Sequence, residues 1–170
     1  MPTFISFDCE ADGPFPPTYS MVSFGAVEVG TENTFYAEIR PISMIWNEKA
    51  LSVGGFTREQ TMGFDDPRVV MKRFNGWVQE IKQRTGSVQL VTDNPYFDAA
   101  FLNYYFHTYV GVNPFGWSSL SLTSMYKGFS RNHRANFKGL RITKHDHNAL
   151  SDALGNAEAL LTIIGKGYKI

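Results

Sequence analysis

The chain has 170 residues, of which 43% are hydrophobic and 15% are aromatic. This composition excludes an intrinsically disordered chain and provides enough apolar surface for one packed domain, which we expect to span residues 1–170. The 16 basic and 16 acidic side chains cancel, so the net charge neither supports nor excludes a polyanionic partner.

Three absences in the sequence narrow the class of protein further: a second cysteine, a membrane helix and a signal peptide. Cys9 is the single cysteine, which excludes an intramolecular disulfide, and its place in an apolar strand predicts a buried thiol. No apolar run approaches the ~20 residues of a membrane helix, and the N-terminus lacks the basic and apolar regions of a signal peptide. The sequence therefore predicts a soluble cytoplasmic protein without a membrane partner.

Three strands are predicted at the start of the chain. The first begins at Thr3 and is ended by Asp12 and the glycine that follows it. Residues 21–29 and residues 34–39 predict the second and third strands, because both stretches are rich in apolar and alternating side chains. The glycine-containing link at residues 30–33 suits a hairpin, so these strands are expected to pair antiparallel.

A long helix is predicted next. Residues 41–65 are expected to be irregular, apart from a short helix near residues 47–51. Asp66 and Pro67 then open a helix, because Asp caps a helix start and Pro fits its first turn. Gly86 ends it. The apolar stripe of this helix consists of Val70, Phe74, Trp77, Val78 and Ile81.

The rest of the chain is predicted to be mostly helical. Residues 88–92 form a short strand, and a helix opened by Asn94 and Pro95 runs to about Val110. A further helix covers residues 120–129, and a basic irregular region follows it.

The last helix is predicted from about Asn148 to Ile164. Its apolar stripe consists of Leu150, Leu154, Ala157, Leu161 and Ile164. The order of the elements predicts an α/β fold with a mixed sheet. The first three strands form an antiparallel meander, the strand at residues 88–92 pairs parallel to the first, and helices flank the sheet.

Asp8 and Glu10 form the first candidate site. Side chains at positions i and i+2 of a strand point to the same face, about 7 Å apart. Two carboxylates on one face of an apolar strand repel each other and resist desolvation, and a hard divalent cation between them would relieve both effects. The alternative is an edge strand with two solvated acids, which fits poorly with the apolar run before them.

Asp98 is the second candidate. It lies in the first turns of the helix that begins after Asn94, and its neighbours at helical spacing are Phe101, Leu102 and Tyr105. A lone acid on an aromatic face is costly unless something pairs with it. The alternative is that Asp98 helps to cap the helix start, where an anion is favoured.

His147 and Asp152 form the third candidate. In a continuous helix five residues rotate by about 500°, which would turn the two side chains apart. The conflict disappears if Asn148 is the N-cap and His147 precedes the helix. Asp152 then shares a side with Asn156 and Ala159, whose small size would let this side approach another element closely. The alternative for His147 is a loop histidine without a role.

These residues carry a resemblance to a known family. The chain resembles the DEDDh exonucleases, the DnaQ-like branch of the ribonuclease H-like fold, from residue 3 to about residue 164. The resemblance rests on three motifs in order: Asp8-x-Glu10, Asn94-Pro-Tyr-Phe-Asp98-Ala-Ala-Phe-Leu102 and His147-x-x-x-x-Asp152.

The resemblance implies hydrolysis of phosphodiester bonds with two divalent cations, Mg²⁺ or Mn²⁺. Asp8 would bridge the ions, Glu10 and Asp152 would complete their shell, and Asp98 would bind directly or through water. His147 would take the proton from the attacking water, for which an unperturbed histidine pKa near 6.5 is suited. Two ions ~4 Å apart can activate water, offset charge in the transition state and support the leaving oxygen.

Further residues are candidates for nucleic-acid contact. Ala11 stands where the family often has Thr, so it offers a nucleotide only its backbone N–H and no hydroxyl. Asn94 belongs to the second motif, which departs from the His-Asn-Ala that is common in the family. Phe15 either stacks on a terminal base or belongs to the core. The basic segment before His147 either contacts phosphates or is a solvated loop. Its candidate residues are Arg131, Arg134, Lys138 and Arg141.

The predicted function is a 3′→5′ exonuclease that releases 5′-mononucleotides from single-stranded 3′ ends. RNA is slightly favoured over DNA, because a free-standing domain of this size resembles the small exoribonucleases. Those relatives are often dimers, so we expect a possible homodimer. Two alternatives stay open: a nuclease fold that binds nucleic acid without cutting it, and a structural α/β protein whose acids hold a stabilising ion.

Overall fold

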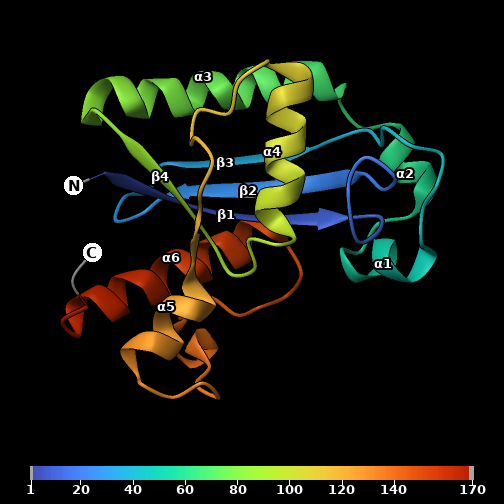
Figure 1. Cartoon of the computed structure of the whole chain (residues 1–170). Coiled ribbons are helices and arrows are strands. Elements are labelled where there is room, and N and C mark those ends of the chain that lie inside the picture. The colour runs from blue at the N-terminus through green and yellow to red at the C-terminus, as the bar shows by residue number, and fades with distance from the viewer. Residues whose placement is uncertain (1, 169–170) are drawn as a thin grey trace.

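The computed structural model describes residues 2–168, which are built around a five-stranded sheet in the order β3-β2-β1-β4-β5 (Figure 1). Three of the strands, β1 (Thr3–Ala11), β2 (Met21–Glu28) and β3 (Thr34–Glu38), form the predicted antiparallel meander. Strand β4 (Val88–Thr92) pairs parallel with β1, as predicted. The mixed α/β fold class expected from the sequence is therefore confirmed.

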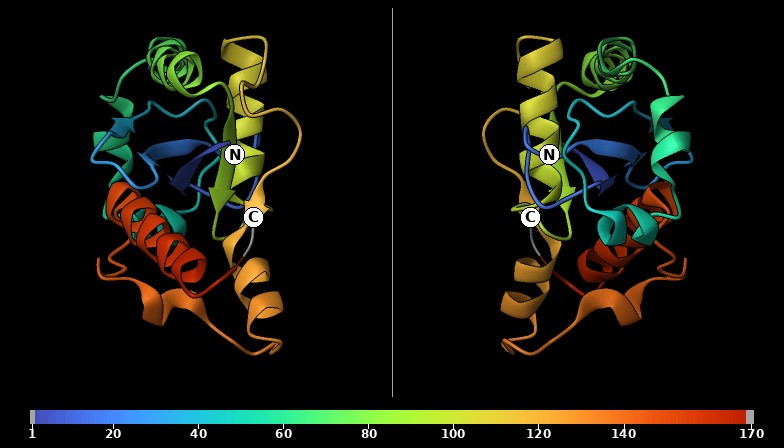
Figure 2. Two further views of the ribbon diagram at one scale, coloured as in Figure 1. Left: turned by 90° about the vertical axis from the view of Figure 1, so that its left-hand side faces the viewer. Right: turned by 90° about the vertical axis from the view of Figure 1, so that its right-hand side faces the viewer.

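One face of the sheet is covered by α3 (Pro67–Thr85) and α4 (Asp98–Tyr109), and Figure 2 shows both helices on the same side. The predicted start of α3 is confirmed, since the Asp66 carboxylate accepts a hydrogen bond from the Arg68 N–H at 2.9 Å. Its predicted end is confirmed too, since Gly86 has a φ of 90°. The core on this face is largely aromatic and includes Phe7, Phe24, Phe74, Phe101 and Phe106.

The opposite face is covered by α5 (Leu122–Phe129), the 3₁₀ helix η1 (Phe137–Leu140) and α6 (Ala149–Gly165). Helix α6 packs on β1 and β2, and the buried Ser6 hydroxyl of β1 donates a hydrogen bond to the Ala153 carbonyl at 2.8 Å. The close approach predicted for the side of α6 with small residues is borne out by the complete burial of Asn156 and Ala159.

The apolar stripe predicted for α6 is partly wrong. Leu161 is exposed, whereas Leu160 and Ile163 are fully buried. The buried face of α6 is rotated relative to the prediction, because the sheet accepts small residues such as Ala153 rather than a row of leucines.

The structure corrects the prediction by one additional helix and by two helix boundaries. The region expected to be mostly irregular contains α2 (Arg58–Met62) in addition to the predicted short helix, α1 (Glu48–Val53). Helix α4 begins at Asp98 instead of after Asn94, because the Asn94 carbonyl accepts from the N–H groups of Phe97 and Asp98 and forms a turn there.

The third correction concerns the helix predicted over residues 120–129, which begins only at Leu122. The two residues before it form β5 (Leu120–Ser121), which pairs parallel with β4. Among residues 2–168, no helix combines the length and the apolar character that crossing a bilayer requires.

Candidate active site

Three carboxylates from two distant parts of the chain meet beside the C-terminal half of β1. Asp8 and Glu10 alternate along β1 with the buried Phe7 and Cys9, which face the aromatic core. Asp152 lies in the first turn of α6. A ligand oxygen of each acid lies within 4.8 Å of the others. The predicted convergence of the first and third motifs is therefore present in the structure.

Asp98 brings the fourth carboxylate to the same region from the start of α4. Its side chain is only 4% exposed, its Oδ2 atom accepts from the Asn94 N–H at 3.2 Å, and its Oδ1 atom accepts from the Cys9 thiol at 3.7 Å. The carboxylate thus ties the turn before α4 to β1. Its negative charge raises the pKa of both Asp8 and Glu10.

The electrostatics of these acids favour a bound cation. Burial, followed by the charges of Asp98, Asp152 and Glu10, raises the pKa of Asp8 well above its usual range. Burial, followed by the charges of Asp152 and Asp98, raises the pKa of Glu10 to about 8. Burial raises the pKa of Asp98 to about 7. At neutral pH, a cluster of carboxyls with raised pKa values is stabilised by protons or by a divalent cation that neutralises its negative charge.

The two carboxylate oxygens of Asp152 have different surroundings. Its Oδ1 atom lies 2.5 Å from Nδ1 of His145 and 3.3 Å from Nη1 of Arg141. Its Oδ2 atom is buried and has no hydrogen-bond partner among the described residues. An unpaired carboxylate oxygen at a site 1% exposed is costly. The all-oxygen set of Asp8, Glu10 and Asp152, with this free oxygen, fits a hard cation such as Mg²⁺ or Mn²⁺.

His147 lies directly before α6, as the sequence predicted. Asn148 is the N-cap, and its side chain accepts from the N–H groups of Leu150 and Ser151 at 3.1 and 3.2 Å. His147 itself has a φ of 60° and an exposed side chain. The imidazole is thereby held outside the helix, near Asp152 and open to solvent.

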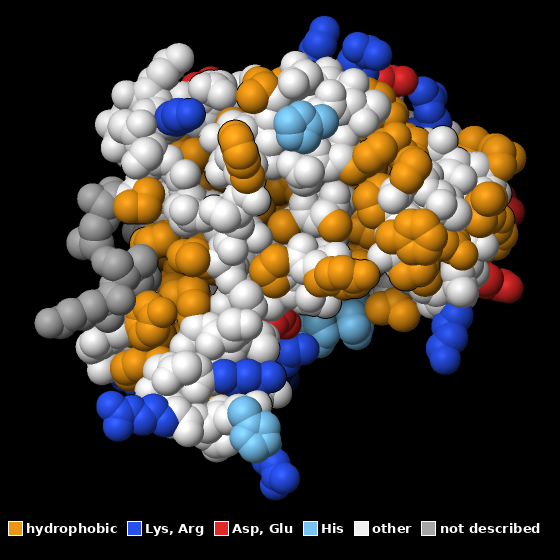
Figure 3. Space-filling model, viewed as in Figure 1, with side chains coloured by type: hydrophobic (Ala, Val, Ile, Leu, Met, Phe, Trp, Pro, Cys, Tyr) orange, Lys and Arg blue, Asp and Glu red, His pale blue; other side chains and the backbone are white. Residues whose placement is uncertain are grey.

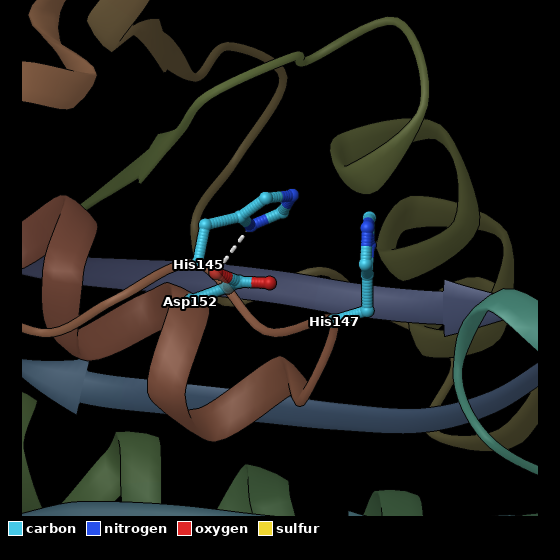
Figure 4. Close-up of side chains that lie close together, drawn as sticks. All are labelled: His145, His147 and Asp152. Atoms are coloured by element: carbon cyan, nitrogen blue, oxygen red, sulfur yellow. Dashed lines mark hydrogen bonds and ion pairs between the residues drawn. The ribbon is translucent and has the colours of Figure 1, made fainter.

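His145 is a residue that the sequence reasoning missed. Its ring lies 4.3 Å from the ring of His147, centroid to centroid, and both rings flank the carboxylate of Asp152 (Figure 4). The sequence did hold one signal, because two histidines separated by one residue precede the helix that carries Asp152. Only the turn at His147 shows that both can reach the same acid.

An apolar pocket of about 300 Å³ adjoins Glu10. Ala11 and Phe97 line it together with residues of α1 and of the turn after β1, namely Gly13, Pro14, Ala50 and Val53. Phe15 follows this turn and is 53% exposed, with its ring edge-on to Tyr19 at 5.7 Å. This exposure excludes the reading of Phe15 as a core residue.

The basic segment lies on the other side of the acids, around η1. In Figure 3, Lys, Arg and His side chains gather along the lower part of the molecule, over α5 and η1. A pocket of about 370 Å³ lies there, lined by Lys127, His133, Arg134 and Lys138 among others. Arg131 is also exposed.

Arg141 differs from the other basic residues. Its side chain is only 4% exposed, and its guanidinium binds the carboxylate of Asp152 and the side-chain oxygen of Asn156, the latter at 2.5 Å. Asp93 lies 3.9 Å from both Arg141 and Lys138, so it connects the acidic site to the basic pocket. Arg141 therefore makes internal contacts, whereas we predicted from the sequence that it contacts nucleic acid together with the other basic residues.

Comparison with known proteins places the chain among nucleases. The family model for the 3′-5′ exoribonuclease Rv2179c-like domain matches residues 3–164. The chain is 37% identical over 173 residues to the 3′-5′ DNA exonuclease Cap18 of Escherichia coli, and the match covers 96% of this chain and 91% of that protein.

Solved structures share the fold. The nuclease domain of 3′hExo, a DEDDh family member bound to rAMP, superposes with a TM-score of 0.78 at 20% identity, covering 96% of this chain and 92% of that chain. Exonuclease I of E. coli in complex with a dT13 oligonucleotide gives a TM-score of 0.73 at 14% identity, covering 98% of this chain and 41% of that chain. These likenesses confirm the predicted ribonuclease H-like fold.

Proposed function

We propose, since the chain belongs to the 3′-5′ exoribonuclease Rv2179c-like domain family, that it removes 5′-mononucleotides from single-stranded 3′ ends in a reaction that depends on divalent cations. The family membership confirms the resemblance to the DEDDh exonucleases and the assignment as a 3′-5′ exonuclease, a hydrolase of nucleic acids. It argues against both non-enzymatic alternatives.

The observation that carries the proposal is that ligand oxygens of Asp8 and Glu10 lie within 4.8 Å of Asp152, whose buried Oδ2 atom has no hydrogen-bond partner among the described residues. The buried Asp98 adds a fourth negative charge that acts on both Asp8 and Glu10. Two Mg²⁺ or Mn²⁺ ions would be held by Asp8, Glu10, Asp98 and Asp152. Bound there, such ions supply charge stabilisation and a more acidic water. Without cations these acids would repel one another in a poorly solvated site, which is the physical reason for assigning them as ligands.

The protein's own groups then have distinct tasks. Asp8, whose pKa is raised by burial and by the charges of Asp98, Asp152 and Glu10, would help to hold both ions. Asp98 fixes the turn before α4 against β1. His147 is exposed beside Asp152 and is free to accept the proton of the attacking water. An imidazole is suited to this step because its ordinary pKa lies near neutral pH.

The substrate strand has a supported path across the site. The apolar pocket beside Glu10 would take the terminal nucleoside, with the backbone N–H of Ala11 beside it and Phe15 exposed for stacking on a base. Asn94 lies at the turn that holds Asp98. On the opposite side of the acids, phosphates upstream of the scissile bond would meet Arg131, Arg134 and Lys138.

RNA and DNA are each supported as the substrate by a different observation. RNA is the proposed substrate because the matching family is one of exoribonucleases and because the sequence favours RNA slightly. DNA is the second candidate, because the 37% identical relative is a DNA exonuclease. Discrimination would depend on contacts to the 2′-hydroxyl.

The test is a cleavage assay on RNA and DNA strands of the same sequence, each labelled at the 5′ or the 3′ end, with EDTA, Mg²⁺ or Mn²⁺. We expect a ladder from 5′-labelled single strands, immediate mononucleotide release from 3′-labelled strands, and slower cleavage of duplexes. Asp8→Asn should abolish both products, whereas Asp65→Asn, at an exposed acid paired with Arg73, should not. Equal cleavage in EDTA, or internal cuts, would contradict the proposal.

A further inference from the structure

Two histidines form a second cluster with Asp152, the acid that also belongs to the all-oxygen set. The nearest ligand atoms of His145, His147 and Asp152 all lie within 4.8 Å of one another. Both histidines come from the segment just before α6, and Asp152 comes from its first turn. The cluster brings two imidazole nitrogens and one carboxylate oxygen to a single point.

The chemistry of this donor set differs from that of the acids on β1. Mg²⁺ takes oxygen ligands and binds imidazole poorly. Zn²⁺ sites that stay open to solvent hold the ion with three protein ligands, drawn from His, Asp, Glu and Cys, and leave the fourth position to water. The set His145, His147 and Asp152 therefore suits Zn²⁺, whereas the set Asp8, Glu10 and Asp152 suits Mg²⁺.

The surroundings of Asp152 support an ion at this place independently of the histidine spacing. Its Oδ1 atom accepts a hydrogen bond from Arg141 and contacts Nδ1 of His145, whereas its Oδ2 atom is buried without a hydrogen-bond partner among the described residues. Figure 4 shows this second oxygen directed toward the side of His147. His145 is 38% exposed, so an ion can reach the cluster from solvent.

We propose that His145, His147 and Asp152 form a zinc site that overlaps the catalytic centre and inhibits it. An ion bound there occupies the nitrogen lone pair of His147, which then cannot accept a proton from water, and it draws on Asp152, which the catalytic ions need. This inhibitory consequence rests on the proposed function, whereas the binding of zinc does not. The enzyme would thus be active with Mg²⁺ and be inhibited when the Zn²⁺ concentration rises.

The binding test uses Co²⁺, a coloured substitute for Zn²⁺, without added Mg²⁺, because Asp152 belongs to both ligand sets. We expect the wild-type chain to give the visible absorption of Co²⁺ with nitrogen ligands, and Zn²⁺ to remove it. His145→Ala and His145→Gln should both lose this absorption and bind Co²⁺ at least ~tenfold more weakly. His107→Ala, at an exposed histidine of α4, should match the wild type.

Two results of this titration would overturn the zinc site. One is the absence of a Co²⁺ absorption in the wild-type chain, and the other is an unchanged absorption and affinity in both His145 variants. Because Gln keeps a polar side chain beside Asp152, agreement between the Ala and Gln variants, with unchanged thermal unfolding, separates loss of a ligand from loss of folding.

The inhibition test measures Mg²⁺-supported cleavage as Zn²⁺ is added. His145→Ala should need at least ~tenfold more zinc than the wild type for half inhibition. Equal sensitivity of the two proteins would overturn the inhibitory role. If the wild type cleaves no nucleic acid, the proposed function fails, while the Co²⁺ titration still decides whether the metal site exists.

Discussion

Gly25 of β2 lies against the backbone of Leu150 in α6 so closely that a Cβ atom at position 25 would collide with the Leu150 Cα. Gly25 is also the residue opposite Asp8 in the β1–β2 register, and Asp152 follows Leu150 by two positions. One contact between a strand and a helix therefore fixes the separation between the first and the last carboxylate of the site.

Gly25→Ala should destabilise the protein and weaken cleavage together. The added methyl group must push α6 away from the sheet, and such overpacking costs about 1–3 kcal/mol. The matched control is Gly76→Ala in α3, where a Cβ meets no atom within 4 Å and where replacement of glycine in a helix should stabilise by up to about 1 kcal/mol. Urea unfolding of both variants tests this, and equal stability of Gly25→Ala and wild type would contradict it.

The stability of the metal-free protein should fall as the pH rises from 5 to 8. The folded-state pKa of Glu10 is about 8 and that of Asp98 is about 7, both above the ordinary values of 4.5 and 3.8. Between these limits the folded chain binds more protons than the unfolded chain, so raising the pH removes stability. Saturating Mg²⁺ should flatten this dependence, because a cation replaces the protons.

Thermal unfolding in EDTA and in Mg²⁺ over this pH range measures the effect. A melting temperature in EDTA that stays constant or rises with pH would refute the burial of charged acids. An equal slope with and without Mg²⁺ would refute their role as ligands.

Arg141→Met should destabilise the protein more than the same substitution at any exposed basic residue. The Arg141 side chain and its partner Asp152 are both buried, and breaking a buried ion pair by removing one partner costs about 3–5 kcal/mol. Arg134→Met, on the exposed face of the basic segment, should change stability by no more than about 0.5 kcal/mol. Denaturant titrations of both variants decide between an internal and a surface role for Arg141.

Exposed bases around η1 should govern affinity for nucleic acid. In an Asp8→Asn background, Arg134→Ala and Lys138→Ala should each weaken binding of a single-stranded oligonucleotide. Each should also lower the slope of log affinity against log salt by about 0.7. Lys72→Ala in α3 provides a control, since Lys72 is exposed on a helix outside this segment. Fluorescence anisotropy at several salt concentrations measures both quantities, and slopes equal to that of the control would remove these residues from the substrate path.

Local chemistry explains what the sequence could predict of the fold. Asp66 and Asn148 act as helix caps whose partners lie two or three residues away, so their roles follow from neighbouring residues alone. Leu120 belongs to a two-residue strand that exists only because β4 lies beside it. Leu161 is exposed because the sheet selects the small-residue face of α6, which no periodicity within the helix can reveal.

The candidate site, like the fold, was predictable only in part. The acids Asp8 and Asp152 were predictable because buried carboxylates in recurring motifs need a common cation. His145 and the internal position of Arg141 were not predictable, since both depend on how the loop before α6 folds back on Asp152. The homodimer expected from the resemblance stays a prediction.

Anomalous diffraction from crystals soaked in Mn²⁺ tests the central claim most directly. We expect two Mn²⁺ ions among Asp8, Glu10, Asp98 and Asp152, with Asp8 in contact with both and the Oδ2 atom of Asp152 no longer unpaired. Saturated crystals without any anomalous peak between these four carboxylates would contradict it.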